Sequence, residues 1–252
     1  MEIATLPLVA RNDQMDYDTS SEATGEGGST MVIGEGKPIK EILAMIEDRS
    51  KILLAGCRGC VTVCCAGGEK EVGILSSAIS LARQNQGKAL EIKEVTLERQ
   101  CDPEYLEEIR SIVDDYEAIL SIACGAGVQF LAETYRTTPI YPGINTNFIG
   151  VTQEQGVWAE RCQSCGDCKL HLTGGICPIT RCAKSLLNGP CGGSSTGKCE
   201  VDPETDCGWQ MIYDRLKELG CLEQLEVIIP ITDWTTSRDG GPRKIVREDL
   251  KL

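Results

Sequence analysis

The stretch KILLAGCRGCVTVCCAGGEKEVGILSSAISLA, residues 51–82, carries the pattern that decides the fold. Its first six residues form a short apolar run that ends in glycine, which is typical of a buried strand. A loop rich in cysteine comes next. After Gly67 and Gly68, apolar residues recur at helical spacing. The stretch therefore predicts a strand, a cysteine loop and a helix.

The same unit occurs twice more along the chain. The segment 89–97 precedes a predicted helix over 103–116, and the segment 118–123 precedes a predicted helix over 128–135. A short amphipathic helix is also expected to begin at Pro38. Strands that alternate with helices favour a parallel sheet. We expect an α/β protein with a small open parallel sheet and flanking helices, followed by an irregular cysteine-rich metal-binding domain.

Composition divides the chain into four regions. The first is acidic and without periodicity, and the third combines many cysteines with glycine-rich turns and few apolar residues. A helix is predicted from Trp209 onward, with Gly220 at its carboxyl end. The expected regions are a disordered acidic tail (1–30), an α/β domain with cysteine loops at the carboxyl edge of its strands (31–150), a cysteine-rich iron–sulfur or metal domain (151–225) and an extended C-terminal tail (226–252).

Charge and hydropathy narrow the possible functions. The net charge of −13 argues against binding nucleic acid, which requires clustered Lys and Arg. The apolar runs have the length of strands, so no membrane insertion is expected, and the amino terminus does not resemble a secretory signal. We therefore expect a cytoplasmic protein. In a reducing compartment, the 15 cysteines favour metal or redox chemistry over disulfides.

Five cysteines are expected at the carboxyl edge of the predicted sheet, where open α/β sheets bind ligands. They could hold an iron–sulfur cluster. The first two could instead form a C-x-x-C redox dithiol or supply the nucleophile of a thiol enzyme, although the chain offers no base beyond His171. Two other cysteines, Cys65 and Cys221, are interpreted as buried core thiols. The five candidate ligands are Cys57, Cys60, Cys64, Cys101 and Cys124.

The segment CQSCGDC provides the strongest local signal. Cys162, Cys165 and Cys168 are each separated by two residues, so one tight turn can direct three thiolates at a single cubane cluster. Cys177 precedes Pro178, as the last cysteine of a ferredoxin-type run does, although it lies farther along the chain than usual. It is the candidate fourth ligand.

Four further cysteines make a second possible set, which we call the downstream set. It could bind another cluster or a structural zinc ion, because Cys₄ zinc sites also stabilise loop-rich modules with weak cores. Nearby cations could offset the negative charge of a cluster, or they could simply be solvated. The downstream set is Cys182, Cys191, Cys199 and Cys207, and the cations are Lys169, Arg181, Lys184 and Lys198.

Together these segments resemble the methylenetetrahydrofolate reductase C-terminal domain family, the small iron–sulfur subunits that accompany a flavin-bearing barrel subunit. The long run TGGICPITRCAKSLLNGPCGG is the most specific segment. The resemblance covers roughly residues 32–225, and it rests on GCRGCVTVCCAGGEKEV, LERQC, ACGAGVQ, YPGINTNF, ERCQSCGDCKLHLTGGICPITRCAKSLLNGPCGGSSTGKCEV and CGWQMIYDRLKELG.

The resemblance implies a non-flavin subunit of an oxidoreductase that is not catalytic alone. Such a subunit relays electrons to the FMN of its partner, which reduces methylenetetrahydrofolate to methyltetrahydrofolate in one-carbon metabolism and the reductive acetyl-CoA (Wood–Ljungdahl) pathway. The implied cofactors are two or more [4Fe–4S] clusters, with zinc as a possible addition. The electron donor could be a ferredoxin, a nicotinamide-oxidising subunit or a heterodisulfide-reductase-like assembly. The alternative is a zinc-stabilised assembly subunit of the same complex that carries no electrons.

Overall fold

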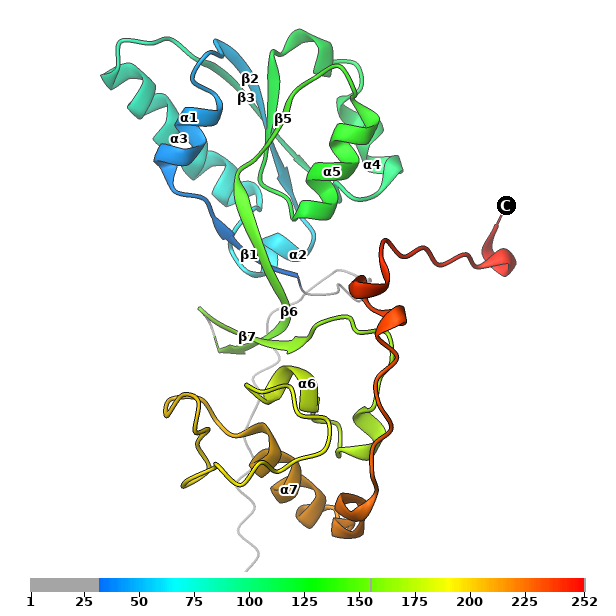
Figure 1. Ribbon diagram of the computed structural model, residues 1–252. Coiled ribbons are helices and arrows are strands. Elements are labelled where there is room, and N and C mark those ends of the chain that lie inside the picture. The colour runs from blue at the N-terminus through cyan, green and yellow to red at the C-terminus, as the bar shows by residue number, and fades with distance from the viewer. Residues whose placement is uncertain (1–31, 155, 252) are drawn as a thin grey trace, which may run out of the picture.

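The computed structural model describes residues 32–154 and 156–251. The predicted acidic tail over 1–30 lies outside the described residues. Figure 1 shows an α/β part that contains the strands β2 to β5 and a second part that contains the helices α6 and α7. The long strand β6 leads from the first part toward the second.

The α/β part is built on a four-stranded parallel sheet with the order β3-β2-β4-β5. The central strand β2 is fully apolar over Ile52–Ala55, and these residues have no exposed surface. A parallel sheet that is covered on both faces requires such a continuous apolar run. The strands are β2 (Lys51–Cys57), β3 (Glu91–Leu97), β4 (Ala118–Ser121) and β5 (Ile140–Pro142).

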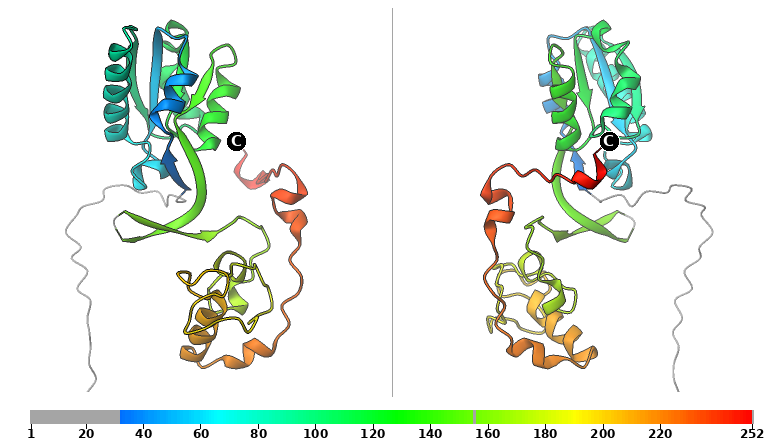
Figure 2. Two further views of the ribbon diagram at one scale, coloured as in Figure 1. Left: turned by 60° about the vertical axis from the view of Figure 1, so that its left-hand side comes forward. Right: turned by 90° about the vertical axis from the view of Figure 1, so that its right-hand side faces the viewer.

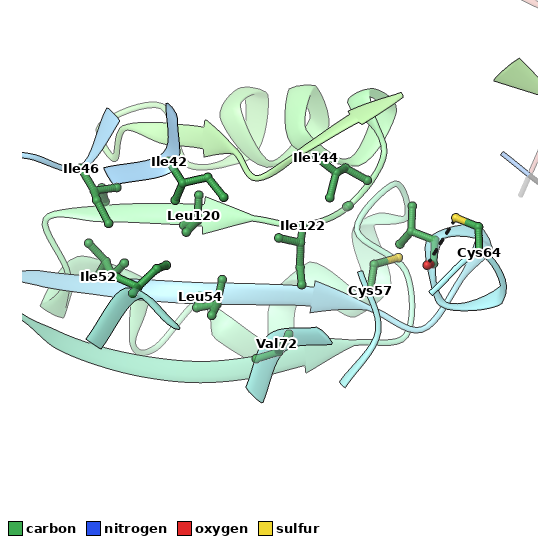
Figure 3. Close-up of a cluster of buried hydrophobic side chains, with 14 of the residues drawn as sticks. Ile42, Ile46, Ile52, Leu54, Cys57, Cys64, Val72, Leu120, Ile122 and Ile144 are labelled. Carbon is green, nitrogen blue, oxygen red and sulfur yellow. Dashed lines mark hydrogen bonds between the residues drawn. The ribbon is translucent and has the colours of Figure 1, made fainter. Parts of the chain in front are cut away.

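Helices cover the two faces of this sheet (Figure 2). On one face, α1 (Ile39–Met45) and α3 (Glu69–Asn85) pack against Ile52 and Leu54 (Figure 3). The side chains of Leu53 and Ala55 point to the other face, where α5 (Gly125–Thr134) contributes its buried leucine. The predicted α/β fold with flanking helices is confirmed for this part.

The helix predicted over 103–116 is interrupted. Only α4 (Pro103–Leu106) is α-helical, and two 3₁₀ turns follow at Glu107–Ile109 and Val113–Asp115. Three apolar residues of this stretch, Leu106, Ile109 and Val113, are buried. Their spacing of three and four residues suits successive 3₁₀ turns as well as an α-helix, so periodicity alone could not separate the two.

A second sheet, which the sequence did not predict, is antiparallel with the order β1-β6-β7. Its strands are β1 (Val32–Gly36), β6 (Ile144–Glu154) and β7 (Val157–Cys162). The predicted boundary between the α/β and cysteine-rich domains, at residue 150, falls inside β6. Strand β7 ends at the first cysteine of the CQSCGDC segment, so this sheet connects the two cysteine-bearing regions.

The cysteine-rich part has a small core of its own around α7 (Gly208–Glu218). Trp209, Ile212 and Leu216 are buried there, and the indole nitrogen of Trp209 donates to the Leu186 carbonyl at 2.9 Å. The predicted helix is therefore confirmed, and Gly220 follows it at a φ of 70°. The short helix α6 (Pro178–Arg181) is the other α-helix labelled here in Figure 1. Within residues 32–154 and 156–251, no helix combines the length and apolar character needed to cross a bilayer.

Candidate functional site

Four cysteines gather at the carboxyl end of the parallel sheet, and we call them the strand-end group. Cys57 is the last residue of β2, Cys60 begins α2 (Cys60–Val63), Cys101 follows β3, and Cys124 precedes the first residue of α5. Burial raises the pKa of the Cys57 thiol, and the charges of Cys124 and Cys101 raise it further. The pKa of Cys101 is likewise raised by burial and then by Cys124 and Cys60. These thiols are therefore close enough to repel one another when ionised.

A buried glutamine fixes the loops that carry this group. The Gln100 side chain has no exposed surface, and its amide nitrogen donates to the carbonyls of Ala55 at 3.0 Å and Gly56 at 2.8 Å. The Ser121 hydroxyl donates to the Gln100 amide oxygen at 2.6 Å. Gln100 thus connects the ends of β2 and β4 to the loop of Cys101. Sequence reasoning missed this residue, although its position directly before a candidate ligand was a usable signal.

Close packing also brings Cys124 to this edge. A Cβ atom on Gly127, in the first turn of α5, would lie 2.9 Å from the Gln100 Cβ and 3.0 Å from the Ala123 Cβ. Only glycine therefore allows α5 to begin so close to the Cys101 loop. The start of α5 is also tied to the second sheet, because the Gly125 amide donates to the Thr146 hydroxyl at 2.8 Å.

Cys64 and Cys65 have settings different from that of the strand-end group. The sulfur of Cys64 is buried against β1, where it accepts a hydrogen bond from the Gly34 amide at 3.4 Å and lies 3.6 Å from the Gly34 carbonyl. Burial raises its pKa. Figure 3 shows Cys57 and Cys64 at the end of the apolar cluster. The role of Cys64 as a metal ligand stays a prediction.

Cys65 and Cys221 were both predicted to be core thiols. Cys65 is exposed, so that prediction is wrong for Cys65, whereas Cys221 is half-buried beside the small core.

The CQSCGDC segment, residues 162–168, forms a turn that we call the triplet loop. Cys165 is half-buried, and Cys162 and Cys168 are exposed. The loop turns through positive φ angles at Ser164 (57°) and Gly166 (84°). The Ser164 amide points at the Cys162 sulfur at 3.4 Å. Backbone N–H groups directed at sulfur are typical surroundings for a cysteine-bound cluster.

Cys177 is held near the start of this loop through α6. It directly precedes the first residue of that helix. The Thr180 hydroxyl donates to the Arg161 carbonyl at 2.9 Å and so ties α6 to the end of β7. The candidate fourth ligand is therefore tethered to the strand that leads into the triplet loop.

The downstream set lies on loops around the small core. Cys182 directly follows α6 and Cys207 directly precedes α7, while Cys191 is exposed and Cys199 half-buried. Three of the four predicted cations form ion pairs with carboxylates, so much of their charge is neutralised. The pairs are Lys169 with Asp167 at 2.8 Å, Lys184 with Glu200, and Lys198 with Asp206 at 2.7 Å. Arg181 is part-buried, and its pKa is lowered by desolvation.

The donor chemistry fits a soft metal, but the spacing is wider than one ion requires. No disulfide joins any of the 15 cysteines, all of which lie in the described residues. Over 32–154 and 156–251, no three Cys, His, Asp or Glu side chains converge closely enough to hold a single ion. Zinc would bring each sulfur to about 2.3 Å from one centre. A four-iron cluster is larger than one ion, so its ligands stand farther apart.

The fold and these thiols define an α/β protein with a cysteine-rich second part. Residues 141–235 match the family model described as methylene-tetrahydrofolate reductase C terminal. The resemblance predicted from the sequence is confirmed over this stretch, which contains the triplet loop, Cys177 and the downstream set. The match associates the chain with methylenetetrahydrofolate reductase and with one-carbon chemistry. Searches of curated proteins and of solved structures found no significant match.

Proposed function

We propose that this chain is the iron–sulfur electron-transfer subunit of a methylenetetrahydrofolate reductase complex. It relays electrons to the FMN of a partner subunit, which reduces methylenetetrahydrofolate to methyltetrahydrofolate. The observation that carries the proposal is the presence of two separate thiol groups on one chain, one at the sheet edge and one in the segment that matches the family. Two redox centres divide the distance that an electron has to cross.

Each group has four candidate ligands. The strand-end group consists of Cys57, Cys60, Cys101 and Cys124, and the second group consists of Cys162, Cys165, Cys168 and Cys177. A bound [4Fe–4S] cluster would supply one-electron transfer at each place. The protein holds the thiolates, excludes water around Cys57 and directs N–H groups at sulfur. If these cysteines were ionised together, the charge on Cys101 would be repelled by those on Cys124 and Cys60, and a bound cationic cluster core would offset that repulsion.

The substrate chemistry belongs to the partner subunit. The sequence has no P-loop, no nucleophile elbow and no dinucleotide-binding glycine motif. The strand-end group could still act as a redox dithiol through Cys57 and Cys60, but burial raises the pKa of Cys57 and so disfavours the reactive thiolate. Electron relay uses these cysteines as thiolate ligands, whose protons are released when the metal binds, and it needs no catalytic base at each turnover.

The second candidate is a zinc-stabilised assembly subunit that transfers no electrons. The downstream set favours this function, because it surrounds a small core that holds few buried side chains. A structural metal stabilises such a module by joining loops that the core alone cannot hold. Zinc at the downstream set is compatible with iron at the strand-end group and at the triplet loop. The electron-transfer function and the assembly function therefore differ in the metal expected at those two groups.

Metal and acid-labile sulfide analysis of protein purified without oxygen separates these functions. Electron relay predicts iron with sulfide and a brown colour that dithionite bleaches. Mixing with the flavin subunit and a reductant should then reduce the FMN, with cluster bleaching preceding flavin bleaching. Zinc as the sole metal, with no sulfide and no colour, would contradict the proposed function and support the assembly subunit.

A further inference from the structure

The C-terminal region returns to the triplet loop. Figure 2 shows it running from the neighbourhood of α7 along the cysteine-rich part and back toward the α/β part. We call residues 233–243 the C-terminal strap. At its start, the Asp233 amide donates to the Asp167 carboxylate at 3.0 Å. The sequence indicated an extended tail beyond residue 226 and gave no sign that it contacts the cysteine loop.

Two side chains of the strap bond to the backbone of the triplet loop. The Thr236 hydroxyl lies 2.9 Å from the Cys165 carbonyl and 2.7 Å from the Asp233 carbonyl, so it can donate to either oxygen. The Arg243 guanidinium donates to the Ser164 carbonyl and to the Thr236 carbonyl, each at 2.8 Å. Two consecutive carbonyls next to the middle thiol are therefore held from outside the loop.

The triplet loop and the strap approach each other closely at Gly166. Gly166 has a φ of 84°, and a Cβ atom placed there would lie 2.5 Å from the Thr236 carbonyl oxygen. A side chain at this position would push the strap away. The left-handed turn and the close approach of the strap thus both require glycine at the same residue.

The strap is internally ordered. The Asp233 carboxylate accepts a hydrogen bond from the Thr235 amide at 3.0 Å. Ser237 is buried, and its hydroxyl accepts from the Asp239 amide at 3.0 Å and lies 2.7 Å from the Trp234 carbonyl. These capped turns limit the conformations that Thr236 can adopt, so the strap can hold the loop instead of moving with it.

We propose that the C-terminal strap is part of the metal-binding site, with Thr236 and Arg243 as positioning residues of the triplet loop. This inference rests on the proposed function, in which the loop binds a cluster. A short loop that directs three thiolates at one centre loses conformational entropy when the metal binds. Contacts that order the loop beforehand reduce this loss, as the residues behind metal ligands generally do. The strap thereby increases the affinity of the loop for its cluster.

The experiment compares Thr236→Val with Thr236→Ser in the full-length chain, because serine keeps the hydroxyl. Arg243→Met is a second variant, at an exposed side chain whose loss creates no cavity. The control is Arg247→Met, since Arg247 pairs with Asp249 at 2.5 Å and not with the loop. In metal-free, reduced protein, the rate of thiol alkylation at each cysteine is followed by mass spectrometry. In reconstituted protein, the spectrum and reduction potential of the triplet cluster and the iron retained against a chelator are measured.

We expect alkylation of Cys165 to become about fivefold faster in Thr236→Val and Arg243→Met, as the loss of one hydrogen bond implies. Alkylation of the exposed Cys191 should not change, and Thr236→Ser and Arg247→Met should behave like the wild type. The reconstituted variants should lose iron from the triplet loop faster and show an altered spectrum there.

Failure of this inference can be told apart from failure of the proposed function. Equal alkylation rates at Cys165 in Thr236→Val, Arg243→Met and the wild type overturn the role of the strap, whatever metal the protein contains. An iron-free wild type overturns the proposed function. In iron-loaded protein, an unchanged spectrum, potential and iron retention in both variants overturn the coupling between the strap and the cluster.

Discussion

The strand-end group and the triplet loop present the same kind of thiol in opposite structural settings. The strand-end group is attached to β2 and α5, and the buried Gln100 ties its loops to the strand ends. The triplet loop is a turn at the end of β7, held by side chains from the strap some 70 residues later in the sequence. The first group is ordered by the core of the fold, and the second by a few polar contacts. Substitutions near the two groups should therefore have effects of different size and kind.

Removing a ligand should have the largest effect. We expect Cys165→Ala to lose the triplet cluster and to slow FMN reduction in the partner subunit by at least about tenfold, because a gap in a redox chain lengthens the electron's path. The flavin should stay bound to its own subunit. Iron and sulfide content, together with stopped-flow flavin reduction, measure the effect.

The matched control for this prediction is Cys65→Ala. Cys65 is exposed and belongs to neither group, so its removal should leave iron content and flavin reduction unchanged. Unchanged iron and turnover in Cys165→Ala would contradict the prediction.

The next largest effect is expected at Gln100. Gln100→Leu leaves the carbonyls of Ala55 and Gly56 and the hydroxyl of Ser121 without their buried partner. We expect the free energy of unfolding to fall by about 2–4 kcal/mol, the cost of several unpaired buried groups. Urea denaturation measures this change. Iron should be lost from the strand-end group while the spectrum of the triplet cluster persists.

Gln129→Leu is the control for Gln100→Leu. The Gln129 side chain is exposed and donates to the Gly125 carbonyl at 3.0 Å, so its loss should cost little. Equal destabilisation by the two substitutions would show that the buried network does not order the strand ends.

A smaller effect is expected where the strap meets the triplet loop. Gly166→Ala places a methyl group 2.5 Å from the Thr236 carbonyl oxygen, and Gly175→Ala places one in open space at a similar φ of 89°. Both substitutions carry the cost of a left-handed alanine, about 1–2 kcal/mol. We expect Gly166→Ala to destabilise the metal-free protein more than Gly175→Ala does, as urea denaturation measures. The difference between the two losses in the free energy of unfolding measures the contact of the loop with the strap. Equal losses in the two variants would show that this contact is weak.

The sequence predicted the elements that hydrophobic periodicity defines. The apolar run at Ile52–Ala55, the helix that follows Gly68 and the helix that begins at Gly208 all form. The antiparallel sheet escaped prediction because β6 is mostly exposed beyond Ile144 and does not alternate regularly. Spacing identified the candidate cysteines, and the position of Gln100 directly before Cys101 was a signal that went unused. The partners of Gln100 and of Thr236 lie in segments distant in the sequence, and no local pattern encodes those contacts.

The pH dependence of stability is expected to show the smallest effect, and it concerns the strand-end group. Burial raises the pKa of Cys57 above its ordinary value of 9.0, so the folded, metal-free protein binds the thiol proton more tightly than the unfolded chain. The resulting stabilisation is fully present below the unfolded pKa and is lost as pH rises through the folded value. The loss cannot exceed about 1.4 kcal/mol per pH unit for one thiol. Urea denaturation at several pH values above about 8 should show a shallower alkaline decline in Cys57→Ala than in the wild type. Parallel declines would indicate that the Cys57 thiol is not buried in the metal-free protein, which would leave the triplet loop as the better ordered of the two groups.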